Sequence, residues 1–171
     1  MSLLVISMPA RERLGGRADG SLAPEAGLPA EWPFVLADDK GLVLHAGRAP
    51  APLLPRAERR VLVLAAADVA WQRLDIPKAP AARLRAALAG VLEDALLDDA
   101  EALHLALAAG AAPGRAGWVA VTAQARLAAG LALLESAPGA PAIDAVVAAL
   151  EPVAEGQPRR GHFQGLLQGG L

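Results

Sequence analysis

The sequence of 171 residues contains no cysteine, which excludes disulfides, thiolate zinc sites and cysteine nucleophiles. We therefore expect the chain to belong in a reducing compartment. Aromatic residues are also scarce, with three tryptophans, two phenylalanines and no tyrosine. Leucine and valine must supply most of the core, because the abundant alanine buries little apolar area.

Long apolar runs are missing as well. None approaches the ~20 residues that a membrane-spanning helix requires, so we expect a soluble chain without direct membrane insertion. Residues 1–7 are apolar but short and lack a basic leader, which favours a first strand over a secretory signal. The formal net charge is -2. Nucleic acid is not expected as a partner, because phosphate binding needs an excess of clustered cations.

Motifs for chemistry are absent too. No Gly-x-x-x-x-Gly-Lys-Ser/Thr stretch occurs, the three histidines have no metal-ligand spacing, and no serine lies in a nucleophile elbow. The pairs Glu93-Asp94 and Asp98-Asp99 could serve acid/base catalysis, but no base converges on them. We predict no catalytic, cofactor-binding or metal-binding residues, and a small carboxylate enzyme remains a weaker alternative.

Residues 1–56 are predicted to form a β-rich N-terminal part. Residues 3–7 are a compact β-branched run that indicates a strand, and residues 9–30 are rich in glycine, proline and charge, which is typical of a long loop.

A hairpin follows in this part. Strands are expected over residues 32–36 and 42–45, on either side of the turn-forming residues 38–41, where Gly41 can take a positive φ. The proline-rich residues 47–55 are the expected linker.

Residues 57–150 are predicted to form a β-α-β-β-α-β subdomain. The order holds from residue 69 to residue 147, and it usually gives one sheet with both helices on one face. Residues 151–171 are read as the start of a further strand whose domain is truncated. The expected strands span residues 61–64, 69–76, 103–107, 117–122 and 142–147, and the expected helices span residues 80–97 and 124–136.

The first of these helices has an apolar stripe and an unusual charge pattern. Leucines and small residues recur along one side, at Leu84, Leu88, Val91 and Ala95. Its basic residues lie early and its acids late, which is opposite to what the helix dipole favours. The pattern fits a partner-binding surface. It equally fits a helix in which alanine has accumulated without functional meaning and the acids are only solvated. The partner-binding candidates are Arg83, Glu93, Asp94, Asp98 and Asp99.

This region also carries a family resemblance. Residues 69–78 (VAWQRLDIPK), 83–88 (RLRAAL), 92–94 (LED) and 103–107 (LHLAL) resemble protein L of the type II secretion system. In that family a strand ending in Leu-Pro leads into a helix with a Leu-Glu-Asp signature, an acidic turn and a strand that begins near Leu-His. The likeness extends more loosely to residues 3–6, 117–121 and 143–147.

The resemblance implies a mixed α/β (α+β) chain with a ribonuclease-H/actin-like fold that has no intact nucleotide site. It also implies a non-catalytic scaffold on the cytoplasmic side of the bacterial inner membrane. The parent protein would be membrane-anchored, and the present chain would form the first part of its cytoplasmic region. The implied partners are the N-terminal domain of the secretion ATPase and other inner-membrane platform proteins, and a homodimer is allowed.

A second hypothesis keeps a working nucleotide site, as in actin-like ATPases or pilus-assembly protein M. Those ATPases place an Asp-x-Gly loop directly after the first strand, where backbone N–H groups bind phosphate. Ser7-Met8-Pro9 stands at that point here, and the Asp19-Gly20-Ser21 triplet is too far along the chain to replace it. We therefore favour the non-catalytic scaffold.

Overall fold

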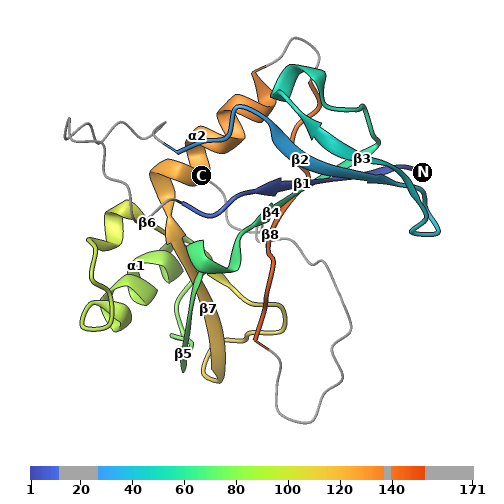
Figure 1. Cartoon of the computed structure of the whole chain (residues 1–171). Coiled ribbons are helices and arrows are strands. Elements are labelled where there is room, and N and C mark those ends of the chain that lie inside the picture. The colour runs from blue at the N-terminus through green and yellow to red at the C-terminus, as the bar shows by residue number, and fades with distance from the viewer. Residues whose placement is uncertain (12–26, 137–139, 153–171) are drawn as a thin grey trace, which may run out of the picture.

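The computed structural model describes residues 1–11, 27–136 and 140–152, and it contains two sheets and two helices (Figure 1). The larger sheet has five strands in the order β3-β2-β1-β4-β8, and the smaller has three in the order β5-β7-β6. The strands of the larger sheet are β1 (Leu3–Met8), β2 (Trp32–Ala37), β3 (Val43–Ala49), β4 (Arg59–Leu64) and β8 (Ala145–Ala148). The other elements are β5 (Ala70–Asp75), β6 (Leu103–Leu107), β7 (Ala116–Ala123), α1 (Ala81–Leu92) and α2 (Gln124–Glu135).

The five-stranded sheet combines an antiparallel hairpin with three parallel strands. β1 pairs antiparallel with β2 and parallel with β4, and β4 pairs parallel with β8. The helix α2 lies between β4 and β8 in the chain, as the crossover between parallel strands requires. This arrangement agrees with the ribonuclease-H/actin-like fold that the resemblance implies, and the three-stranded sheet with α1 is inserted between β4 and α2.

Alternation along β1 explains how this sheet packs. Leu4, Ile6 and Met8 are buried on the face that α2 covers, whereas the intervening residues are half-buried. Leu127 and Leu134 of α2 belong to the same core cluster. Burying such side chains contributes about 1.5–3 kcal/mol each, so this interface stabilises the larger sheet substantially.

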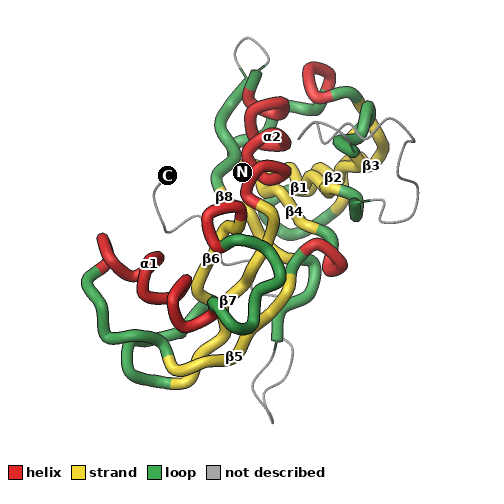
Figure 2. The backbone as a smooth tube through the Cα atoms, turned by 90° about the vertical axis from the view of Figure 1, so that its left-hand side faces the viewer, coloured by secondary structure: helices red, strands yellow, loops and turns green. Residues whose placement is uncertain are grey.

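The three-stranded sheet has a core of its own. Leu88 and Leu92 of α1 pack against Leu103, Val119 and Val121 of the sheet. α1 lies on the side of this sheet that is remote from α2 (Figure 2). The two helices therefore cover different sheets.

That arrangement corrects one prediction. The β-α-β-β-α-β order is present in β5, α1, β6, β7, α2 and β8, but the expected single sheet does not form, because β8 pairs with β4 of the larger sheet. All four residues of β8 are buried. β8 is the edge strand beside β4, and a strand that is apolar on both faces suits a parallel sheet with both faces covered better than an antiparallel sheet covered on one face.

Two element boundaries also differ from the sequence prediction. The first helix ends at Leu92 instead of residue 97, and Val91 is 55% exposed. The stripe that packs on the sheet therefore runs through the half-buried Leu84 and the buried Leu88 and Leu92. The expected linker over residues 47–55 is partly regular, because β3 continues to Ala49 and a 3₁₀ turn spans Ala51–Leu53.

The structure also bears on the predicted domain boundary, the predicted long loop and the predicted last strand. The predicted division between residues 56 and 57 falls between β3 and β4 of one sheet. Most of the predicted loop over residues 9–30 and nearly all of the predicted strand after residue 151 lie outside the described residues. Among the helices of the described part, none is long and apolar enough to span a membrane.

Candidate functional site

The carboxyl end of α1 forms a hollow with an acidic rim. The helix ends at Leu92, whose carbonyl accepts hydrogen bonds from the N–H groups of Ala95 (2.8 Å) and Leu96 (3.0 Å). This turn carries the chain away from the helix axis toward a short 3₁₀ turn at Ala100–Ala102. The hollow has a volume of about 330 Å³, and it is lined by Ala89, Gly90, Glu93, Leu96, Leu97, Asp98, Asp99 and Ala100.

The hollow combines negative charge with one exposed apolar side chain. Glu93, Asp98 and Asp99 are exposed, and no ion pair among the described residues involves them. The helix carboxyl end adds a partial negative charge of its own. Leu97 is fully exposed at 105% of its reference area. The site is therefore suited to a partner that offers a cation beside an apolar group.

The predicted partner-binding residues fall into two groups. Glu93, Asp98 and Asp99 are brought together around the hollow, and Asp94 is exposed in the same turn. Arg83 is exposed in the first turns of α1 and does not line the hollow.

Arg85 has a structural role that the sequence analysis missed. Its Nη2 donates to the carbonyl oxygens of Leu103 (2.9 Å) and Ala100 (3.3 Å), and to Oε1 of Gln124 (3.3 Å). These bonds hold the segment after the hollow against α1, so Arg85 positions the acidic loop. These acceptors explain why Arg85 lies early in the helix, where the helix dipole disfavours a positive charge. Every residue has a backbone carbonyl, so the sequence does not show which carbonyls accept hydrogen bonds from an arginine. The order of charged residues along the helix therefore could not predict these contacts.

A second place of interest is the carboxyl end of β1, because actin-like ATPases place a phosphate-binding loop directly after their first strand. Arg126, in the first turn of α2, is only 7% exposed there. Its Nη2 donates to the Pro9 carbonyl (2.8 Å) and its Nη1 to the Gly27 carbonyl (2.8 Å), and its Nε lies 3.7 Å from Oδ2 of Asp68. The same Oδ2 accepts the N–H of Arg11 (2.9 Å). The loop after β1 thus presents a carbonyl to a buried arginine at this edge.

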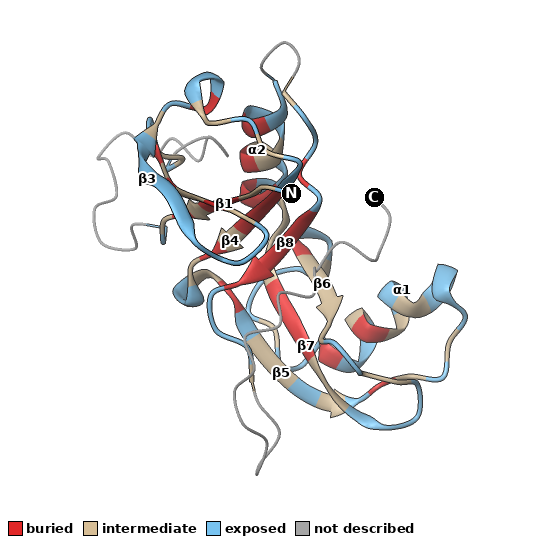
Figure 3. Cartoon of the chain, turned by 90° about the vertical axis from the view of Figure 1, so that its right-hand side faces the viewer, coloured by how far each residue is buried: buried red, intermediate tan, exposed pale blue. Residues whose placement is uncertain are grey.

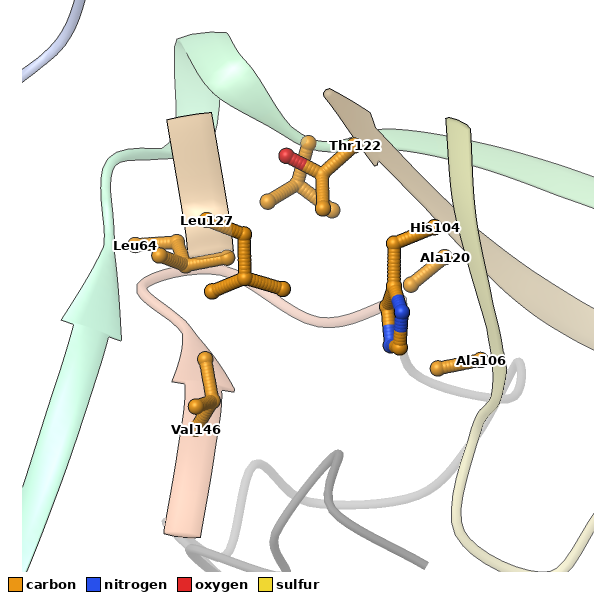
Figure 4. Close-up of a pocket in the computed structure, with 8 residues that line it drawn as sticks. Leu64, His104, Ala106, Ala120, Thr122, Leu127 and Val146 are labelled. Carbon is orange, nitrogen blue, oxygen red and sulfur yellow. The ribbon is translucent and has the colours of Figure 1, made fainter. Parts of the chain in front are cut away.

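A small apolar cavity lies where the two sheets meet (Figure 4). Its volume is about 10 Å³, and it is lined by Leu64, Val69, His104, Ala106, Ala120, Thr122, Leu127 and Val146. Mostly apolar side chains from both sheets line it together with His104, which lies on the opposite face of β6 from the leucines because successive side chains of a strand alternate in direction. The cavity is a packing gap and offers no set of polar groups for a ligand.

His104 makes stability depend on pH. Burial, and secondarily the charge of Arg85, lower the pKa of its imidazole below 6.5. Above the unfolded pKa of about 6.5 the ring is neutral in both states; below it the unfolded chain takes up the proton first, so stability falls as the pH drops. We expect the unfolding free energy of the wild type to fall more between pH 7.5 and 5.5 than that of His104→Gln, as measured by urea titration. Equal losses would contradict this role of His104.

Comparison with known proteins supports the fold. No family model matches the sequence, and no curated protein matches it. A solved structure of the cytoplasmic domain of EpsL, an inner membrane component of the type II secretion system of Vibrio cholerae, has a TM-score of 0.56 and 18% identity. That match covers 86% of this chain and 57% of the EpsL chain, so the present chain spans little more than half of that domain. The PilM-PilN type IV pilus biogenesis complex matches at a TM-score of 0.44 and 16% identity, over 86% of this chain and 46% of that one.

The resemblance found in the sequence therefore also holds for the fold. This chain has the fold of the EpsL cytoplasmic domain, in agreement with the mixed α/β, actin-like fold that the family resemblance implies. At 18% identity the likeness concerns the fold.

Proposed function

We propose that the chain is a non-catalytic adaptor of a type II secretion platform, and that it docks the N-terminal domain of the cytoplasmic secretion ATPase. The observation that carries this proposal is the hollow at the end of α1, with three acids and an exposed leucine. The likeness to the cytoplasmic domain of an inner-membrane secretion component supports a proposed setting on the cytoplasmic side of the inner membrane. We include other inner-membrane platform proteins and a second copy of the chain among the proposed partners.

The energetics of the hollow assign different roles to its residues. Exposed ion pairs contribute about 0.2–1 kcal/mol each, whereas complete burial of a leucine contributes about 1.5–3 kcal/mol. Leu97 would therefore supply more binding free energy than any single acid. The acids would orient the partner and raise the association rate, and salt would weaken that contribution.

The adaptor is proposed to lack nucleotide chemistry. Phosphate binding after a strand depends on backbone N–H groups that point at the anion. At the corresponding edge here, the Pro9 carbonyl points at Arg126, and proline has no N–H to offer. The guanidinium is already bonded to two carbonyls and lies beside Asp68, so it is not a free phosphate ligand.

The nucleotide hypothesis predicts that the chain binds ATP, whereas the adaptor proposal predicts that it does not. A titration separates the two. We expect no heat of binding and no change in melting temperature when magnesium and ATP are added to the wild-type chain at millimolar concentration. Saturable ATP binding by the wild type that Arg83→Ala retains would support an actin-like or pilus-assembly protein M-like nucleotide site and would overturn the non-catalytic proposal. Arg83→Ala is the control, because Arg83 is exposed on α1, which packs against the three-stranded sheet and not against the sheet that contains β1.

A further inference from the structure

Arg85 of α1 lies where the layers of the two helices meet. Its Nη2 donates to the carbonyl oxygen of Leu103 at the start of β6 (2.9 Å) and to Oε1 of Gln124 in the first turn of α2 (3.3 Å). Leu103 pairs with Ala123, the last residue of β7, so both acceptors lie at the same end of the three-stranded sheet. One guanidinium thus joins α1 to the beginning of α2.

The position of Gln124 is set by the five-stranded sheet. Gln124 is the first residue of α2 and follows β7 without an intervening loop. The first turn of α2 is fixed by the buried Leu127 and by Arg126, whose guanidinium donates to carbonyls of distant segments. Figure 3 shows buried residues along α2, whereas most of α1 is exposed. Gln124 therefore offers Arg85 an acceptor whose place is determined outside the layer of α1.

The acidic segment after α1 is held in part by the same guanidinium. Residues 93–99 are exposed at every position except Leu96, which packs against the core of the three-stranded sheet. The carbonyl of Ala100, which lines the hollow, accepts a further bond from Nη2 of Arg85 (3.3 Å). The place of the rim acids therefore depends on the direction in which the guanidinium points.

We propose that Gln124 is a positioning residue for the acidic hollow, because its Oε1 holds the Arg85 guanidinium in the rotamer that reaches the Ala100 carbonyl. A free arginine side chain has many rotamers, and a fixed acceptor offsets the entropy lost when one of them is selected. The rim acids then follow the first turn of α2, so docking depends on how the two layers are arranged. The inference rests on the proposed function only for its consequence on ATPase binding.

His104 reports the position of Arg85 without any partner. The charge of Arg85 contributes, after burial, to lowering the pKa of the His104 imidazole from its ordinary value of 6.5. The other residues that line the cavity beside this ring carry no charge. When Arg85 turns away, the imidazole pKa should rise, while burial still holds it below its ordinary value.

NMR of the full chain alone tests the proposal with Gln124→Met, which keeps the size of the side chain and removes the acceptor. Amide hydrogen exchange at Ala102, whose N–H bonds to the Asp99 carbonyl (2.9 Å), should become about threefold faster or more, as expected for the loss of one hydrogen bond. The imidazole pKa of His104 should rise. Gln124→Glu, which keeps an acceptor, should retain the wild-type exchange rate.

Three further variants make the readings specific. Gln72→Met makes the same substitution on β5, at the other edge of the three-stranded sheet, and should change neither reading. Arg85→Met removes the guanidinium and sets the full size of the rise in the His104 pKa. Gln124→Ala repeats the test with a residue that favours helix, in case methionine disturbs the first turn of α2.

The proposal is overturned if Gln124→Met and Gln124→Ala leave the exchange at Ala102 and the His104 pKa at their wild-type values. It is also overturned if Gln124→Glu accelerates the exchange as much as Gln124→Met does. Both readings are made without the ATPase domain, so a failure of docking does not affect them. Where the domain binds, Gln124→Met should weaken its affinity about threefold, and Gln124→Glu should restore it.

Discussion

Charge reversal of Glu93, Asp94 and Asp98 to lysine is expected to weaken binding of the secretion ATPase N-terminal domain by about tenfold or more. Each lost pair contributes about 0.2–1 kcal/mol, and reversal replaces attraction by repulsion near the negative end of α1. A change of 1.4 kcal/mol corresponds to a factor of about ten in affinity. Isothermal titration calorimetry measures the effect, and the fold should survive because all three side chains are exposed.

A matched control separates the hollow from net charge. The triple variant Glu31→Lys, Asp39→Lys and Asp75→Lys changes the charge by the same amount at exposed positions away from the hollow. It should bind the ATPase domain nearly as well as the wild type. If both triple variants bind equally, the acids around the hollow are merely solvated and the docking site lies elsewhere.

The apolar part of the site can be tested separately. Leu97→Ala removes the fully exposed leucine without opening a cavity, so the unfolding free energy should hardly change. Affinity for the ATPase domain should fall, and the loss should persist at high salt, where the effect of the acids fades.

Arg126→Met is expected to lower the unfolding free energy by about 3–5 kcal/mol. Removal of the guanidinium leaves the carbonyls of Pro9 and Gly27 without these donors and leaves Asp68 without its cation. Arg126 also joins the end of β1 to the segment that enters the three-stranded sheet, so the damage should spread to both sheets. Urea unfolding measures the loss, and Arg83→Ala, at an exposed site, should change stability by no more than about 0.5 kcal/mol.

A double-mutant cycle attributes the loss to the buried pair. Asp68→Asn removes the charge that Arg126→Met would leave unpaired, so the double variant should be more stable than the sum of the two single losses implies. Additive losses, or a loss below about 1 kcal/mol for Arg126→Met, would show that the arginine does not hold this edge together.

A compact apolar run and a group of turn residues made much of the larger sheet predictable. Residues 3–7 form that run, which becomes β1, and the hairpin turn before Leu42 has a glycine at 41 with a positive φ of 80°. The placement of β8 was not predictable in the same way, because a strand buried on both faces shows no alternation that would tie it to one sheet. Its parallel partner β4 lies about 80 residues earlier in the chain.

The helix α1 shows why alanine-rich segments are hard to read. With small residues on every side, several apolar stripes fit the sequence equally well, and only packing against Leu103 and Val121 selects Leu88 and Leu92 over Val91. The acids after the helix were recognised as a group, and the turn at Leu92 then brings them around one hollow. The roles of Arg85 and Arg126 stayed hidden, because they bond mainly to backbone carbonyls from distant segments.

Direct binding between this chain and the purified N-terminal domain of the secretion ATPase tests the central claim. Calorimetry at high micromolar concentration should give a saturable isotherm that weakens with salt and with the reversal of Glu93, Asp94 and Asp98. Absence of heat, together with separate elution of the two proteins in gel filtration at the same concentration, would contradict the adaptor function of this chain.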